Sequence, residues 1–122
     1  EDFPGACREF VKAMLYSETD AVLQRWILDD MAAAPSAVAR SAMDNMLDLY
    51  VTGKLATLFE AIPLPVIVVN GDLWPANFEA NRRHMHSFDA LIVEKGDHFL
   101  MMHRAEDCNP ALEEAVEILS KK

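Results

Sequence analysis

The stretch AIPLPVIVVNGD, residues 61–72, decides how this chain folds. Pro63 and Pro65 precede a continuous β-branched run at residues 66–69, and the turn signal Asn70-Gly71 ends that run. Strands that are apolar at every position are typical of parallel sheets, because helices cover both faces of such sheets. The stretch therefore predicts a buried strand of a parallel sheet, and with it the α/β fold class.

The residues after this strand repeat the alternation of helix and strand. Residues 76–88 fit a crossover helix, and residues 89–98 (DALIVEKGDH) contain a second buried strand followed by its loop. The last residues predict a closing helix, with Asp107 or Asn109 as its cap and Pro110 in its first turn. Residues 62–122 are thus expected to form a β-α-β-α unit with parallel strands.

Residues 1–61 are expected to form a helical region instead. Apolar residues recur at helical spacing between the capping signal Thr19-Asp20 and Pro35, which predicts one helix there. Ser36 is expected to cap a second helix, and a shorter helix completes the region. These helices are moderately amphipathic, so they need another surface to cover.

Two parallel strands do not form a stable sheet alone, because both outer edges expose unpaired backbone groups beside apolar faces. Neighbouring strands are therefore expected from an N-terminal half, from another chain or from self-association into a homo-oligomer. The chain begins with Glu1 and not with Met, so further residues are expected upstream.

The composition narrows the range of functions. Apolar residues make up 52% and charged residues 25%, which is typical of a globular chain and not of a disordered one. The net charge of -9 disfavours nucleic acid and anionic membranes as partners. Cys7 and Cys108 have neither metal-ligand nor disulfide-framework spacing, so a cytoplasmic location and no metal site are expected.

Asp72 and His98 are the candidate catalytic residues. Each follows one of the two predicted strands, and catalytic groups in parallel sheets gather at the carboxyl ends of strands. A carboxylate that orients an imidazole is the acid–base half of a nucleophile–His–acid triad. A turn residue at position 72 and a packed histidine at position 98 are the alternative interpretations.

Two stretches of the chain together resemble the C-terminal portion of α/β-hydrolase fold enzymes. They are IPLPVIVVNGD and, after it, DALIVEKGDHFLMMHRAEDCNPAL. The resemblance is most specific over residues 63–119, and the helices before it resemble part of the helical cap of that family. It implies a partial α/β-hydrolase fold, divided into a cap-like region at 1–61 and a core part at 62–122. It also implies that His98 is the catalytic base, that Asp72 is the acid and that no cofactor is needed.

The sequence departs from the family pattern in two places. The usual acid lies three residues after the loop glycine, where this chain has Trp74, so Glu79 or an upstream strand is the alternative source of the acid. The nucleophile elbow Gly-x-Ser-x-Gly is absent, and Gly5-x-Cys7 has too few residues before it for a supporting strand. A structural role for Cys7 near the start of a helix is therefore the favoured interpretation.

Two functions are compatible with these observations. The first is a C-terminal fragment of a carboxylic ester or related acyl hydrolase that acts on a small apolar substrate and is inactive alone for lack of a nucleophile. The alternative is a truncated, non-enzymatic fragment that oligomerises through its strand edges and cap helices.

Overall fold

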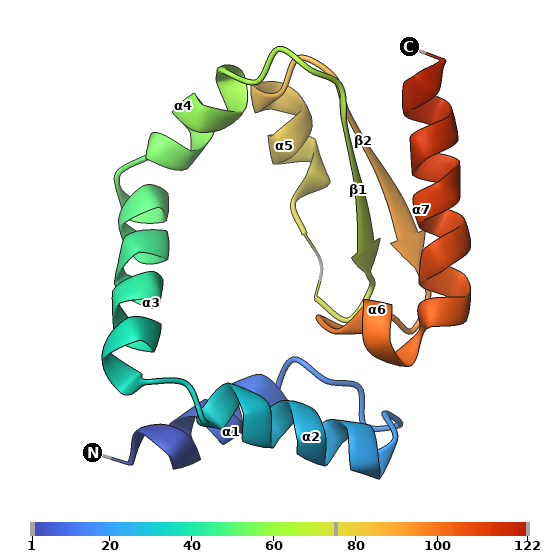
Figure 1. Cartoon of the computed structure of the whole chain (residues 1–122). Helices are drawn as coiled ribbons and strands as arrows, with labels where there is room; N and C mark the ends of the chain where they lie inside the picture. Colours follow the sequence, from blue (N-terminus) through green and yellow to red (C-terminus); the bar gives the residue numbers. More distant parts are fainter. Residues whose placement is uncertain (1, 75, 122) are drawn as a thin grey trace.

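The computed structural model describes residues 2–74 and 76–121, and within them the chain is a mixed α/β fold (Figure 1). The elements follow in the order α1 (Phe3–Lys12), α2 (Ala21–Ala32), α3 (Ser36–Val51), α4 (Lys54–Glu60), β1 (Val66–Gly71), α5 (Phe78–His84), β2 (Phe88–Val93), α6 (Leu100–His103) and α7 (Ala105–Ser120). The parallel pairing of the two predicted strands is confirmed.

The two strands run side by side along their whole length. Their register places Val66 opposite Phe88 at the amino ends and Gly71 opposite Val93 at the carboxyl ends. Figure 1 shows α5 and α7 on opposite sides of the strands, as expected when helices connect and follow parallel strands. Both loops that follow the strands therefore leave the same edge of the sheet.

The apolar core consists of two small clusters. Val11, Leu15 and Ile27 form the first cluster between α1 and α2, and Phe99 packs against it. The second cluster lies between β2, α6 and α7 and consists of Val93, Leu100 and Cys108. Because Phe99 and Leu100 are neighbours in the chain, the segment after His98 touches both clusters. This segment joins the helical region to the carboxyl edge of the sheet.

The helix α3 stands apart from the sheet in Figure 1 and packs mainly against α4. None of its residues is buried, and its side chains Val38, Met46 and Tyr50 are exposed. The N-terminal helices were expected to cover another surface. Within the described residues, α3 has no such surface to cover.

The predicted helix starts were right for one helix and wrong for two. Asp20 caps α2 by accepting hydrogen bonds from the backbone N–H groups of Val22 and Leu23, both at 3.0 Å. Ser36 does not cap α3, because Pro35 occupies the cap position and Ser36 is already helical. Neither of the expected cap residues of the closing helix is its cap. The helix α7 begins at Ala105, with Arg104 at the cap position, and Pro110 lies inside it.

The prediction that β1 is buried on both faces is also wrong for this chain. Its first five residues are only partly buried, and Ile92 on β2 is 45% exposed. The physical reason is that the described sheet has two strands, so each strand has one unpaired edge and neighbours on one side only.

Candidate functional site

The loops after β1 and β2 are pressed together at the carboxyl edge of the sheet. The backbone N–H of Leu73 donates a hydrogen bond to the carbonyl of Gly96 at 3.1 Å. A Cβ atom on Gly71 would lie 2.0 Å from that same carbonyl oxygen, so only glycine permits this approach. Asp72 and His98, which belong to these two loops, are thereby brought to one edge, as their positions after parallel strands predicted.

His98 presents an exposed imidazole at this edge. Its ring lies edge-on to the ring of Phe99, with the centroids 5.1 Å apart, and its backbone N–H donates to the carbonyl of Met14 at 3.2 Å. Within residues 2–74 and 76–121, neither ring nitrogen of His98 forms a hydrogen bond. The imidazole is therefore free to act on a group that approaches from outside the chain.

A cleft of about 220 Å³ lies beside His98, and Met14, Asn70 and Trp74 contribute to its walls. The indole N–H of Trp74 donates to the carbonyl of Ala13 at 3.1 Å, which holds that wall in place. None of the described residues that line the cleft is a serine, threonine or cysteine. The cleft thus offers an imidazole and apolar walls but, among the described residues that line it, no hydroxyl or thiol nucleophile.

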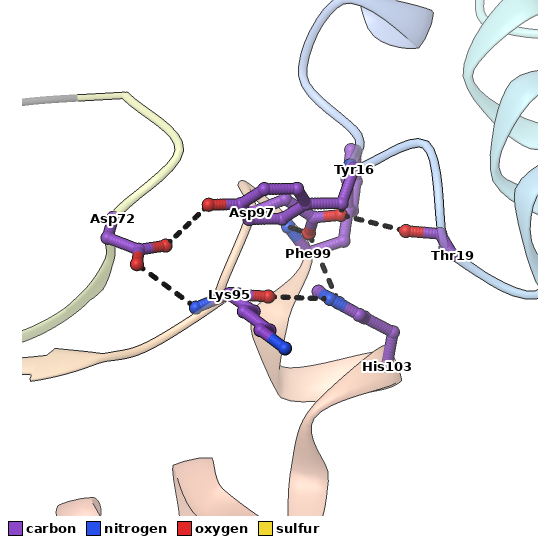
Figure 2. Close-up of polar contacts among 7 residues, drawn as sticks. All are labelled: Tyr16, Thr19, Asp72, Lys95, Asp97, Phe99 and His103. Carbon is purple, nitrogen blue, oxygen red and sulfur yellow. Dashed lines mark hydrogen bonds and ion pairs between the residues drawn. The ribbon is translucent and has the colours of Figure 1, made fainter.

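Asp72 is held by groups other than His98. Its carboxylate accepts a hydrogen bond of 2.7 Å from the Tyr16 hydroxyl and one of 3.1 Å from the backbone N–H of Lys95 (Figure 2). Among the described residues, no hydrogen bond joins Asp72 to His98, so its role as the acid stays a prediction. Glu79, the alternative acid, is an exposed residue in the first turn of α5.

The Tyr16–Asp72 hydrogen bond shifts the pKa of both partners. The Tyr16 hydroxyl, followed by the Lys95 backbone N–H, lowers the pKa of the Asp72 carboxyl. The same hydrogen bond, with burial and the charge of Asp72 as further causes, raises the pKa of the Tyr16 hydroxyl. The bond therefore favours an ionised Asp72 and a protonated Tyr16, which is the pair of states expected at neutral pH.

Tyr16→Phe is expected to raise the titration midpoint of Asp72, because the main cause of its low pKa is lost. A lowered pKa in the folded state gives stability that is present above the unfolded carboxyl pKa of about 3.9 and is lost as the pH falls through the folded value. A raised pKa for Tyr16 gives stability that is lost as the pH rises through its folded value. The difference in Tm between wild type and Tyr16→Phe should therefore be largest between about pH 5 and pH 9.

Carbon-detected NMR of the carboxyl groups and thermal unfolding at pH 3 and pH 7 measure these two effects. Tyr50→Phe is the matched control, because the Tyr50 side chain is 75% exposed and lies on α3. If the Tm difference between wild type and Tyr16→Phe were the same at both pH values, the Tyr16–Asp72 hydrogen bond would not be the main cause of the lowered pKa of Asp72.

Asp97 is the residue that sequence reasoning missed. The α/β-hydrolase pattern often has glycine or another small residue at this position, next to His98, and the resemblance assigns Asp97 no catalytic role. Its side chain is instead fully buried and accepts hydrogen bonds from the Tyr16 and Phe99 backbone N–H groups and from the Thr19 hydroxyl (Figure 2). A carboxylate beside the histidine, where a small residue is usual, was the one available signal.

His103 and Cys7 have structural positions. The imidazole of His103 is largely buried, with Nδ1 3.3 Å from Asp97 Oδ1 and Nε2 3.2 Å from the carbonyl of Lys95. Cys7 lies in α1, packs against the first apolar cluster and donates through Sγ to the carbonyl of Met31 at 3.5 Å. Its position supports the interpretation of Cys7 as a structural residue.

Comparisons of the chain with protein-family models, with curated proteins and with solved structures found no match. Over the part of the chain that the structure describes, no group of three or more His, Cys, Asp or Glu side chains could hold a metal ion. In the same part, no helix is both long enough and apolar enough to cross a bilayer.

Proposed function

We propose that this chain is the C-terminal portion of an α/β-hydrolase fold enzyme that cleaves small carboxylic esters or related acyl compounds. The observation that carries the proposal is the position of His98, an exposed imidazole beside a cleft at the carboxyl edge of parallel strands. In this proposal residues 1–61 are the cap-like region and residues 62–122 belong to the core. The resemblance of residues 63–119 to that family supports the assignment.

His98 would act as a general base and then as a general acid. It would take the proton of a nucleophile supplied from outside this chain, and it would return a proton to the leaving alcohol after attack on the acyl carbon. Asp72 is suited to stabilise the imidazolium, because its lowered pKa keeps it ionised. To orient the His98 ring directly, Asp72 would have to accept a further hydrogen bond from the ring beside those from Tyr16 and Lys95.

The cleft supports a small substrate with an apolar acyl group. Its volume of about 220 Å³ is below the usual range for drug-sized ligands, and Met14 and Trp74 supply apolar surface. The family resemblance implies no cofactor. Cys7 and Cys108 are free thiols, which supports the cytoplasm as the location.

A second function, a fragment that self-associates without catalysis, is favoured by the exposed surface. The chain exposes 8587 Å², whereas a compact monomer of 13.7 kDa exposes about 6,600 Å². The excess of about 2,000 Å² is more than the roughly 800 Å² that each partner buries in a typical interface. A second copy that covers the strand edges and α3 would bury this area, as would the N-terminal half of a hydrolase.

Complementation distinguishes the two functions. The chain would be produced alone and together with the polypeptide encoded directly upstream of Glu1, and each sample would be assayed with a short-chain aryl ester. We expect hydrolysis only from the complemented sample, which we term the completed enzyme. An upstream sequence without a Gly-x-Ser-x-Gly elbow, or a complemented sample without hydrolysis, would contradict the hydrolase proposal.

Light scattering on the chain alone tests the second function. A dimer or larger assembly supports self-association, and a well-folded monomer contradicts it.

A further inference from the structure

The segment between α1 and α2 is hydrogen-bonded to four residues of the two site loops, Asp72, Trp74, Asp97 and His98. Its backbone carbonyls at residues 13 and 14 and the two polar groups of residue 16 make the contacts. The hydrogen bonds are Trp74 Nε1–H to the Ala13 carbonyl, His98 N–H to the Met14 carbonyl, Tyr16 N–H to Asp97 Oδ2 and Tyr16 O–H to Asp72 Oδ1. Residues 13–16, which we call the clamp segment, therefore join the helical region to both site loops.

Among the residues that contact the clamp segment, Asp97 forms the most hydrogen bonds. Its Oδ2 accepts from the Tyr16 N–H at 3.1 Å and from the Thr19 hydroxyl at 3.2 Å. Its Oδ1 accepts from the Phe99 N–H at 2.7 Å and lies 3.3 Å from His103 Nδ1 (Figure 2). One buried carboxylate thus ties together the clamp segment, the residue after His98 and α6.

The orientation of His98 depends on its backbone. Its imidazole has no hydrogen-bond partner among the described residues, and its ring lies edge-on to the ring of Phe99. Its backbone is restrained on one side by the Met14 carbonyl and on the other by the bond from Phe99 N–H to Asp97. A change in the attachment of Asp97 would therefore act on the ring of His98 through the backbone that carries it.

We infer that Asp97 is a positioning residue for His98, and that it couples the helical region to the catalytic loop through the clamp segment. This inference rests on the proposed function for the role of His98, but the coupling itself is a property of this chain. When Tyr16 and Thr19 are held by Asp97, His98 is fixed at the cleft. When they are released, Asp97 Oδ2 loses both of its donors, the carboxylate that holds the Phe99 N–H through Oδ1 is less fixed, and the backbone that carries the His98 ring gains freedom.

NMR of the 122-residue chain with labelled histidine and backbone amides tests the coupling without any catalytic turnover. Asp97→Asn puts an amide N–H₂ group opposite bound donors, so we expect the ring resonances of His98 to lose the shift caused by Phe99. We also expect the amides of Tyr16 and Phe99 to exchange at least about tenfold faster, as the loss of a charge-assisted hydrogen bond implies. The matched control is Asp89→Asn, because Asp89 is an exposed residue on β2.

Thr19→Val and Thr19→Ser are a pair of smaller changes. They test whether Asp97 positions His98 if Asp97→Asn fails to fold. The first removes only the hydroxyl that donates to Asp97, and the second keeps it. We expect Thr19→Val to move the His98 ring resonances and Thr19→Ser to restore them. Unchanged ring resonances in Thr19→Val, or equal changes in Asp97→Asn and Asp89→Asn, would overturn the inference.

The two proposals can fail separately. A completed enzyme that does not hydrolyse esters would contradict the proposed function, although the NMR coupling would stand. Unperturbed His98 resonances would contradict the positioning role, although ester hydrolysis by the completed enzyme would stand.

Discussion

His98→Ala is expected to lower kcat/KM of the completed enzyme for a short-chain aryl ester by about 10² to 10⁴-fold, the usual contribution of a general acid–base group. His98 lines the cleft, and its ring nitrogens form no hydrogen bond with the described residues. The loss should fall on kcat more than on KM, because the proton transfer occurs in the transition state and the apolar walls of the cleft remain. Steady-state kinetics at several ester concentrations separate the two constants.

His86→Ala is the matched control for this variant. His86 is also exposed, but it precedes β2 and so lies near the amino edge of the sheet, opposite the site. Its replacement should leave both constants unchanged. Hydrolysis that survives His98→Ala, or that falls equally in both variants, would show that the base lies elsewhere.

The position of the site could be predicted from the sequence because the prediction needed only the direction of two strands. The β-branched run at residues 66–69 and the run before Glu94 each indicated a strand, and parallel pairing then placed the following loops at one edge. The burial of those strands could not be predicted in the same way. It depends on neighbours that the described chain does not supply.

The start of the closing helix shows how packing can override local signals. Asp107, Asn109 and Pro110 together indicate a helix start, yet they lie inside α7. Cys108 belongs to the buried cluster with Val93 and Leu100, and its burial draws the residues before it into the helix. Pro110 lies in the second turn of α7, where it removes the backbone hydrogen bond to the Glu106 carbonyl and costs the helix about 3 kcal/mol.

The contacts of the acid and of Asp97 could not be predicted because their partners are distant in sequence. Tyr16 is 56 residues from Asp72 and 81 residues from Asp97. Nothing in the residues around position 16 indicates that this turn lies against the carboxyl edge of the sheet. The arrangement follows from the packing of Phe99 on the first cluster, which is a tertiary contact.

Gly71→Ala is expected to destabilise the fold by about 3 kcal/mol, at the upper end of the usual effect of overpacking. The added Cβ would meet the carbonyl oxygen of Gly96 at 2.0 Å and its carbonyl carbon at 2.3 Å. Both are backbone atoms, so a change of rotamer cannot relieve the overlap and the two loops would have to separate. The hydrogen bond from Leu73 N–H to Gly96 lies in the same contact and would be strained with it.

Gly53→Ala separates this overlap from the general effect of replacing a glycine. No atom lies within 4 Å of a Cβ placed on Gly53, but its φ of +73° lies in the left-handed region, which costs an alanine about 1 to 2 kcal/mol. Urea unfolding of both variants gives the two free energies, and amide spectra show whether the signals of Asp72 and Gly96 move. If Gly71→Ala were no more destabilising than Gly53→Ala and left those signals in place, the two loops would not be in contact in solution. Asp72 and His98 would then lose the shared edge on which their joint assignment depends.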